Sequence, residues 1–255
     1  MRTIVVIPTY QEALNVLEAL ARVREAAPEA DILVVDDSSP DGTAELAAKA
    51  GEEMGGIRVL VRAERQGLGP AYREGWQWAI DHGYEAVVSM DADGSHDPAS
   101  LPSLLGPLEA GADLVMGSRY VPGGSVPGWA LHRLLLSRVG NRYAGLVLGC
   151  GVHDATGGYR AYRADLLRRI DLSTLHANGY GFQIELVHRS VELGAHVMEV
   201  PITFVDREFG TSKMSAAIVW EALALVTWWG LRDRLIRPWL TGRSKPPGLG
   251  SGGGG

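Results

Sequence analysis

The stretch Ala86-Val87-Val88-Ser89-Met90-Asp91-Ala92-Asp93 joins a short apolar run to two carboxylates that are one residue apart. The run predicts a buried strand, because short aliphatic segments are typical of parallel strands covered on both faces. Side chains at positions i and i+2 of an extended segment point the same way, so Asp91 and Asp93 can reach one divalent cation. Surface turns also produce this spacing, but a position directly after a strand favours ligand binding.

Short aliphatic runs and helical stretches alternate around this motif. Apolar residues recur at spacings of three and four in the helical stretches, and Pro98 is placed as a first-turn proline. The alternation predicts an α/β fold with a mostly parallel, doubly wound sheet. We expect strands at 3–7, 31–35, 57–61, 86–90 and 113–117, and helices at 12–26, 41–54, 68–82 and 98–109. After Ser118 the pattern is less regular, with helices expected at 129–148 and 181–193, a strand or loop at 157–163 and an extended segment at 196–205.

The composition is that of a globular chain. Its 255 residues are 46% hydrophobic and 21% charged, which is enough to bury the core of an enzyme domain. The formal net charge of −6 argues against a nucleic-acid binder, because such proteins neutralise phosphates with basic residues. The single cysteine, Cys150, cannot form an internal disulfide and fits a small buried hydrophobe in a reducing compartment.

A second acidic stretch, Val35-Asp36-Asp37-Ser38-Ser39-Pro40-Asp41-Gly42-Thr43, follows the second expected strand. One carboxylate at this level can accept hydrogen bonds from nucleobase N–H groups, and guanine offers two neighbouring donors. We assign that contact to Asp37, whereas Asp41 is equally suited to capping the next helix. After the first strand, Tyr10 can cover a base and Glu12 can bind ribose hydroxyls. The alternative for this pair is a turn with an acidic residue in the first helical turn.

Several well-known catalytic motifs are missing from the sequence. There is no P-loop, and Gln66-Gly67-Leu68-Gly69-Pro70-Ala71 lacks the third glycine of a dinucleotide fingerprint. A nucleophile elbow, a zinc-binding helix and a Cys-x-x-Cys pair are missing as well. Isolated histidines more often pack or bond to the backbone, so structural roles are expected for His96 and His153.

Five blocks of the sequence together point to a known family. The blocks are Val6-Ile7-Pro8-Thr9-Tyr10-x-Glu12, Val35 to Thr43, Met90-Asp91-Ala92-Asp93, Gly117-Ser118-Arg119-Tyr120 and Asp206-Arg207-x-Phe209-Gly210-x-Ser212-Lys213. Together they resemble the dolichol-phosphate or polyprenol-phosphate mannose synthases, a branch of the family 2 glycosyltransferases. The resemblance covers about residues 4–213 and implies an enzyme with a GT-A (Rossmann-like) fold. It implies GDP-mannose as donor, a polyprenyl monophosphate as acceptor, and Mg2+ or Mn2+ as cofactor.

The resemblance also implies roles for individual residues. Asp91 and Asp93 are the implied catalytic and metal-binding carboxylates, and Ser95, where some relatives have glutamine, is a possible third metal ligand. Arg119 and Lys213 are the implied catalytic cations, which suit charge-assisted hydrogen bonds to phosphate. The implied donor-binding residues are Pro8, Tyr10, Glu12, Val35, Asp37, Asp91, Ala92, Asp93, Arg119, Arg207 and Lys213.

The implied reaction explains why no catalytic His/Asp dyad is found. A polyprenyl phosphate oxygen is already anionic near neutral pH, so its attack on the anomeric carbon needs no strong general base. The enzyme must instead neutralise the departing GDP and orient two anions that repel each other. A single displacement inverts the anomeric centre, which predicts a β-mannosyl phosphate from the α-linked donor.

Two apolar segments with basic residues are candidates for contact with the lipid. In 129–148, leucines and valines are interleaved with arginines, and we place Arg133 and Ser137 near the lipid phosphate together with Arg119. The segment at 211–240 is too short in its apolar part to span a bilayer. Its tryptophans and arginines favour an amphipathic helix at a membrane interface, or one that docks on a membrane-anchoring subunit. A buried C-terminal helix is the alternative.

The expected organisation is a GT-A catalytic domain at 1–210, the helical segment at 211–240 and a flexible, glycine-rich tail at 241–255. The apolar run at 3–7 is too short for a signal peptide, so we expect a cytoplasmic protein, peripheral on the cytoplasmic face of a membrane. Two other functions stay open. One is a related transferase that uses a UDP-sugar such as UDP-glucose, and the other is a non-enzymatic, receiver-like nucleotide-binding module.

Overall fold

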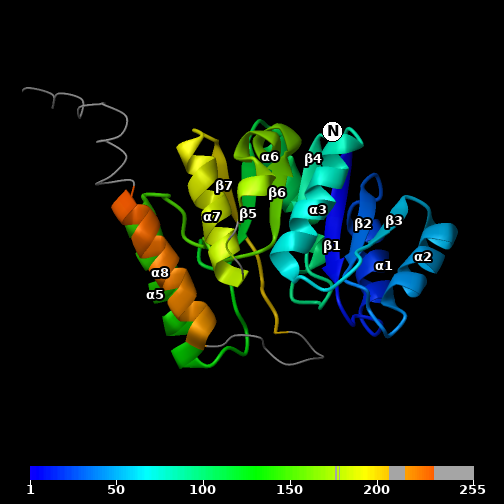
Figure 1. Cartoon of the computed structure of the whole chain (residues 1–255), viewed down its shortest axis with the longest axis horizontal. Coiled ribbons are helices and arrows are strands. Elements are labelled where there is room, and N and C mark those ends of the chain that lie inside the picture. The colour runs from blue at the N-terminus through cyan, green and yellow to red at the C-terminus, as the bar shows by residue number, and fades with distance from the viewer. Residues whose placement is uncertain (176, 178, 207–215, 233–255) are drawn as a thin grey trace, which may run out of the picture.

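The core of the protein is one seven-stranded sheet with helices on both faces (Figure 1). The structure, a computed structural model, describes residues 1–175, 177, 179–206 and 216–232. The strand order is β3-β2-β1-β4-β6-β5-β7, and β6 alone runs antiparallel to its neighbours. The strands are β1 (Thr3–Thr9), β2 (Asp31–Asp36), β3 (Ile57–Val61), β4 (Ala86–Ser89), β5 (Leu114–Ser118), β6 (Arg160–Arg163) and β7 (Val197–Pro201).

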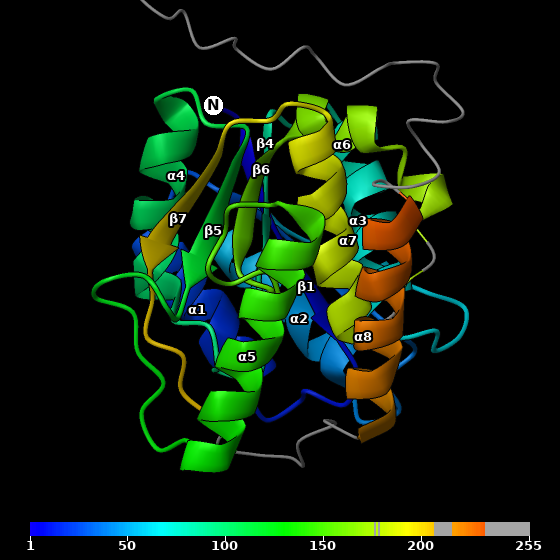
Figure 2. The ribbon, with the colours of Figure 1, turned by 90° about the vertical axis from the view of Figure 1, so that its left-hand side faces the viewer.

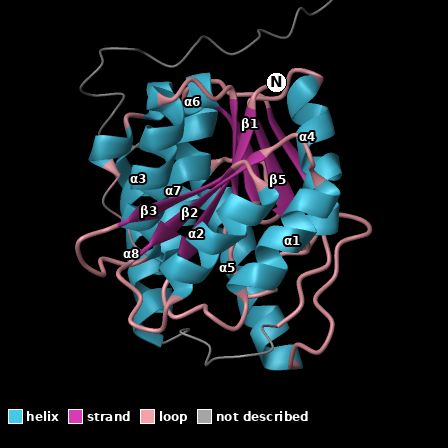
Figure 3. Cartoon of the chain, turned by 90° about the vertical axis from the view of Figure 1, so that its right-hand side faces the viewer, coloured by secondary structure: helices cyan, strands magenta, loops and turns pink. Residues whose placement is uncertain are grey.

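The helices form two layers around the sheet and a separate pair at one end (Figures 1 and 3). Helices α1 (Val16–Ala26), α2 (Thr43–Met54) and α4 (Leu101–Glu109), the last preceded by η1 (Pro98–Ser100), pack on one face. Helices α3 (Leu68–Asp81), α6 (Ala164–Ile170) and α7 (Gly179–Glu192), with η2 (Leu172–Thr174), pack on the other. The pair is α5 (Leu131–Leu148) and α8 (Ala216–Leu231).

Side chains of β1 show how the sequence builds the two cores. Val5 and Ile7 point into the core under α1 and α4, whereas Ile4 and Val6 point into the core under α3 and α7. All four are fully buried, as the near-continuous aliphatic run of this strand predicts. The α/β class and the mostly parallel sheet are therefore confirmed.

Helix α3 approaches the sheet unusually closely at Gly75. A Cβ atom at this position would lie 2.6 Å from Cγ1 of Val6 and 2.9 Å from Cγ2 of Val35. Glycine lets the helix backbone pack directly on β1 and β2, which fixes the start of α3 next to the ends of these strands. Val35, expected at the guanosine pocket, is fully buried in this core.

The second half of the chain departs from simple alternation in two ways. The segment at 157–163, expected as a strand or loop, supplies the reversed strand β6, and the short helix α6 that follows it was not expected. The remaining predicted elements are present, and their bounds shift by a few residues.

Helices α5, α7 and α8 form a third cluster (Figure 2). Within α8, Val226 and Trp229 are buried against α5 and α7, whereas Trp228 is 57% exposed. The helix is thus partly a buried packing element, as the alternative interpretation predicted, and partly an exposed apolar surface. None of the described helices has both the length and the apolar character to cross a bilayer. Residues 211–215 and 233–255 of the expected C-terminal segment and tail lie outside the described part.

Candidate active site

A cleft of about 630 Å³ opens at the edge of the sheet where the parallel strands end. It is lined by the segments that follow the six parallel strands, β1 to β5 and β7, and by the loop that precedes β6. Since β6 is antiparallel, that loop reaches the same edge as the other strand ends. The cleft brings together ten of the residues singled out from the sequence: Pro8, Tyr10, Glu12, Asp37, Asp91, Ala92, Asp93, Ser95, Arg119 and Arg133.

The acidic motif after β4 is held by hydrogen bonds on both sides. The hydroxyl of Tyr72 donates to Oδ1 of Asp91 at 2.9 Å, and the backbone N–H of Ser95 donates to Oδ1 of Asp93 at 3.1 Å. Burial and the nearby charge of Asp91 raise the pKa of Tyr72 well above its usual value, so this phenol stays a donor. Nδ1 of His96 accepts the backbone N–H of Asp91 at 3.0 Å, which confirms a structural role for this histidine.

The motif suits a cation that arrives with phosphate. Among the described residues there is no group of three or more histidine, cysteine or acidic side chains that could hold a metal by itself. Asp91, Asp93 and the hydroxyl of Ser95 offer only oxygen ligands, the kind that Mg2+ and Mn2+ prefer. Mg2+ is commonly bound by one or two carboxylates plus substrate phosphates, and the two carboxylates here fit that mode.

At the other end of the cleft, Asp37 is buried and paired with Arg62. Its Oδ2 also accepts the backbone N–H groups of Gln66 at 3.3 Å and Gly67 at 3.1 Å. A carboxylate has about four lone-pair sites, so a base with two donors must share or displace one of these protein donors. Burial disfavours the charge of Arg62, but its bonds to Glu74 and Asp37 outweigh this and raise its pKa. Arg62 therefore holds the Asp37 carboxylate in place through a buried ion pair.

One face of the Tyr10 ring is covered by Arg65, and both side chains line this part of the cleft. The guanidinium carbon of Arg65 lies 3.9 Å from the centre of the Tyr10 ring, a cation–π contact. Asp41 accepts the hydroxyl of Thr43 at 2.6 Å and the backbone N–H of Ala13 at 3.2 Å. Asp41 thus joins the start of α2 to the loop after β1, but the N-cap position expected for it is held by Gly42.

Arg119, directly after β5, is held by a buried acid. Its Nε and Nη2 donate to the two carboxylate oxygens of Asp154 at 2.7 and 2.6 Å, and Nη2 also donates to Thr156 at 2.8 Å. Asp154 is fully buried. Burial opposes its ionisation, but the charge and hydrogen bonds of Arg119 outweigh burial and lower the pKa of Asp154. The fork geometry fixes the plane of the guanidinium at the cleft wall.

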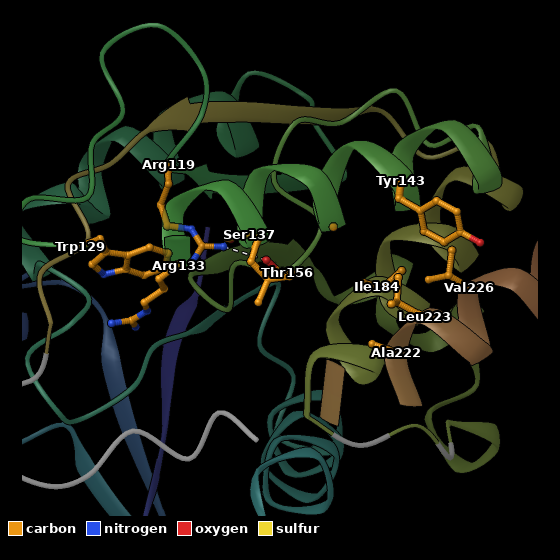
Figure 4. Close-up of a pocket in the computed structure, with 12 residues that line it drawn as sticks. Arg119, Trp129, Arg133, Ser137, Tyr143, Thr156, Ile184, Ala222, Leu223 and Val226 are labelled. Atoms are coloured by element: carbon orange, nitrogen blue, oxygen red, sulfur yellow. Dashed lines mark hydrogen bonds between the residues drawn. The ribbon is translucent and has the colours of Figure 1, made fainter. Parts of the chain in front are cut away.

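A second, apolar pocket of about 80 Å³ adjoins the cleft between α5, α7 and α8 (Figure 4). The cleft and the apolar pocket share four lining residues: Arg119, Trp129, Arg133 and Thr156. The two spaces therefore meet at the cations Arg119 and Arg133. Ser137 lines only the apolar pocket, where its hydroxyl accepts that of Tyr120 at 2.6 Å. Toward the far end, Figure 4 shows Tyr143, Ile184, Ala222, Leu223 and Val226.

Arg207 and Lys213, implied as phosphate-binding cations, lie outside the described residues. The structure adds residues that sequence reasoning missed: Tyr72, Arg62, Arg65, Asp154 and Thr156. The sequence offers one signal for Asp154, which is an acid in the glycine-rich loop between Gly149 and Gly158. It does not indicate the partner, Arg119, which is 35 residues away. Arg62 and Arg65 follow the third strand, at the level of the other strand ends.

This fold and cleft are those of a GT-A glycosyltransferase, and the chain belongs to glycosyl transferase family 2, whose profile matches residues 4–171. Two relatives are each 50% identical to it. One is the polyprenol monophosphomannose synthase of Mycolicibacterium smegmatis, over 92% of this chain and 89% of the relative. The other is the undecaprenyl-phosphate mannosyltransferase of Micrococcus luteus, over 92% of this chain and 96% of the relative.

A solved structure shares the fold at much lower identity. It is the mannosyltransferase PcManGT from Pyrobaculum calidifontis in complex with GDP-Man and Mn2+. The likeness has a TM-score of 0.57 at 17% identity and covers 93% of this chain and 71% of the other. Membership of the family makes the protein an enzyme and excludes the receiver-like module.

Proposed function

We propose that the protein transfers mannose from GDP-mannose to a polyprenyl monophosphate and releases GDP. The observation that carries this proposal is the meeting of an acidic, polar cleft with an apolar pocket at Arg119 and Arg133. A sugar nucleotide needs the first space and an isoprenoid chain the second. The two cations lie where the acceptor phosphate and the sugar of the donor would come together.

The donor half of the proposal rests on the ends of β1, β2 and β4. Asp37, paired with Arg62, provides a carboxylate for the N–H groups of guanine, and Tyr10 provides the ring face that Arg65 does not cover. Asp91 and Asp93 line the same cleft, and we assign the diphosphate to them. The names of both curated relatives include mannose transfer, and the Pyrobaculum enzyme was solved with GDP-Man.

The acceptor half rests on the apolar pocket and on the relatives' names, which specify polyprenol or undecaprenyl phosphate. The walls of the pocket between α5, α7 and α8 are mostly apolar surface, as a prenyl chain requires. At the end next to the cleft, Arg119 and Arg133 supply positive charge, and Ser137 supplies a hydroxyl. Phosphate is bound well by arginine, because the guanidinium offers paired donors.

The chemistry is a single displacement. A phosphate oxygen of the acceptor forms a bond to the anomeric carbon, the bond from that carbon to the GDP oxygen breaks, and GDP leaves with the electron pair. Attack from the face opposite GDP gives a β-mannosyl phosphate. A divalent cation, when bound at Asp91 and Asp93, stabilises the charge that develops on the departing diphosphate. Arg119, oriented by Asp154, neutralises charge on the acceptor side, and Arg207 and Lys213 are proposed to contact the phosphates.

We also propose that the exposed apolar surface of α5 and α8 contacts the cytoplasmic face of a membrane or a membrane-anchoring subunit. Exposed apolar side chains gather on this end of the molecule: Leu131, Leu135, Leu136, Val139, Leu146, Trp228 and Leu231. Arg138 and Arg142 on α5 are exposed among them and suit anionic headgroups. The apolar pocket lies between the same two helices, which would allow a lipid to enter from the bilayer.

Vesicle flotation tests this surface. The double substitution Val139→Ser and Trp228→Ala should reduce binding to anionic vesicles that contain polyprenyl phosphate. The matched control is Leu17→Ser on α1, which removes a side chain of similar exposure from another part of the surface. Trp229 is unsuitable because it is buried, and its removal would disturb the packing of α8. Equal flotation of all three proteins would contradict the proposal.

The reaction itself is tested by the transfer of radiolabelled mannose from GDP-mannose to a short polyprenyl phosphate. The expected product is a metal-dependent lipid β-mannosyl phosphate that is lost with a chelator and largely lost in Asp93→Ala. UDP-glucose supplied as the competing donor distinguishes the related UDP-sugar transferase. Turnover of UDP-glucose in preference to GDP-mannose would overturn the assignment of the donor. A product with α configuration would overturn the single displacement.

A further inference from the structure

Asp206 carries a carboxylate that occupies an anion site at the junction of the cleft and the apolar pocket. Its Oδ2 accepts Nη1 of Arg133 at 2.7 Å, and its Oδ1 accepts the same nitrogen at 2.9 Å. Oδ1 also accepts the indole N–H of Trp129 at 3.1 Å. The side chains of Trp129 and Arg133 thus form a small binding site for a negatively charged group, here called the cradle.

The cradle is built by packing as well as by charge. The guanidinium carbon of Arg133 lies 3.9 Å from the centre of the Trp129 ring, and Phe204 contacts the same ring edge-on with centroids 5.7 Å apart. The bridge between Ser125 and Thr203 joins the two chain segments that carry these aromatic residues. These ring contacts hold the indole at the junction, besides its hydrogen bond to Asp206.

One donor of the cradle has no acceptor among the residues that the structure describes. Nε of Arg133 is shielded from solvent and has no hydrogen-bond partner in the described part of the chain. A buried N–H group without an acceptor is destabilising, which points to a further polar ligand at this guanidinium. Arg133 and Trp129 line both spaces, so a ligand here touches the donor cleft and the apolar pocket together.

We propose that the Asp206 carboxylate holds the place of the acceptor's phosphate, and that Trp129 and Arg133 are the groups that bind this phosphate when Asp206 leaves. The inference rests on the proposed function, to which it adds a ligand and a displaced residue. A phosphate monoester carries about −1.5 to −2 charges near neutral pH, against −1 for a carboxylate, and therefore attracts Arg133 more strongly. It also offers a third oxygen for the unpartnered Nε.

The two anions exclude each other. A carboxylate and a phosphate on one guanidinium repel, so binding of one favours departure of the other. The side chain of Asp206 is 49% exposed, and ion pairs with such exposure contribute little to stability, so the exchange has a low cost. Without acceptor, Asp206 neutralises Arg133 and keeps it from pairing with the donor's diphosphate in the shared space.

Binding of citronellyl phosphate, a short isoprenoid monophosphate, tests the exchange on the full chain. The indole N–H resonance of Trp129, assigned through Trp129→Phe, should shift on titration and keep this response in saturating GDP. Asp206→Asn should bind about threefold more tightly, since an exposed competing ion pair is removed. Trp129→Phe should bind about tenfold more weakly, because it loses a hydrogen bond to a charged group. Asp165→Asn is the matched control, because it removes the acid of another exposed Asp–Arg pair.

Three comparisons can overturn the inference. Affinity that is unchanged or weaker in Asp206→Asn would show that the carboxylate does not compete with the ligand. A Trp129 shift produced by GDP alone, or blocked by it, would assign the cradle to the donor. Equal binding of inorganic phosphate would identify a free-anion site, and an equal shift with citronellol would exclude a phosphate contact. Because these are binding measurements, an enzyme that fails to transfer mannose would contradict the proposed function without removing the Asp206 result.

Discussion

The Arg119 guanidinium is fixed by two parallel hydrogen bonds to the fully buried Asp154 carboxylate, at 2.7 and 2.6 Å. Asp154 also accepts the backbone N–H of Arg119 at 3.0 Å, so the acid determines both the chain path and the side-chain direction after β5. A cation at the junction of two binding spaces is thereby preorganised by a residue that does not line either of them. Asp154 is a positioning residue.

Asp154→Asn should reduce mannosyl transfer strongly and destabilise the protein. The amide cannot neutralise Arg119, and removal of one partner of a buried ion pair typically costs about 3–5 kcal/mol. Transfer assays at a temperature where the variant stays folded separate the two effects. The Km for the acceptor should rise more than that for GDP-mannose. Rises of equal size for both substrates would contradict a positioning role on the acceptor side.

The same pair predicts a dependence of stability on acidic pH. The folded-state pKa of Asp154 is lowered. The contribution of the Asp154–Arg119 pair to the free energy of unfolding is therefore fully present above the unfolded-state pKa of about 3.9. It is lost as the pH falls from about 4 through the lower folded-state pKa. Urea unfolding of wild type and Asp154→Asn should show a stability difference that shrinks across this acidic range. A difference that persists unchanged at the lowest pH would contradict the assignment.

Tyr72→Phe should weaken the dependence on metal without dismantling the cleft. The phenol donates to Asp91 at 2.9 Å, and hydrogen bonds that orient a metal-binding carboxylate typically affect metal affinity by about 10–100-fold. We expect a metal concentration for half-maximal transfer about tenfold higher. Tyr84→Phe is the control, because that hydroxyl donates to Asp31 at 2.6 Å, and Asp31 does not line the cleft. Equal metal curves for both variants would contradict the prediction.

Asp37→Asn should lower the preference for guanine. The carboxylate accepts from Arg62, Gln66 and Gly67, and any base that bonds to it gains a charged acceptor worth about 1.5–3 kcal/mol. Calorimetric titration with GDP and with inosine diphosphate, which lacks the 2-amino group, isolates this contact. Wild type should prefer GDP to inosine diphosphate. The variant should bind the two nucleotides weakly and with nearly equal affinity. A retained preference in the variant would place guanine recognition elsewhere.

Gly75→Ala should destabilise the fold, whereas Gly106→Ala should not. A Cβ on Gly75 would overlap Val6 and Val35, and overpacking of a core typically costs about 1–3 kcal/mol. Gly106 in α4 has no atom within 4 Å of an added Cβ, so alanine there should raise helix stability by about 0.5–1 kcal/mol. Urea unfolding followed by circular dichroism measures both. Similar losses in the two variants would contradict the close approach of α3.

The helical and strand periods of the first 118 residues correctly predicted the five strands β1 to β5. Strands β1, β2 and β4 end at Thr9, Asp36 and Ser89, and polar ligand-type residues follow within a few positions. Parallel strands place such endings at one edge, so the donor part of the candidate site follows from local pattern and one rule of topology. The roles of Asp37, Asp91 and Asp93 in binding stay predictions.

The acceptor part could not be predicted in this way, because it depends on contacts between distant segments. Arg119 meets Asp154, and Arg133 meets Asp206, at separations of 35 and 73 residues. No periodicity encodes such pairs. The direction of β6 decides the first of them, since the reversed strand brings the loop at 154–158 to the edge where the parallel strands end.

The sequence by itself determined the alternation of buried strands and amphipathic helices, since side-chain period and propensity are local properties. It also determined which strands end in acids. Only the tertiary structure decided which arginines pair with these and other acids. It also decided that the apolar pocket opens beside the cleft. Those features depend on the reversed strand β6 and on the packing of α8 against α5 and α7, where burial of apolar surface between distant segments overrides local pattern.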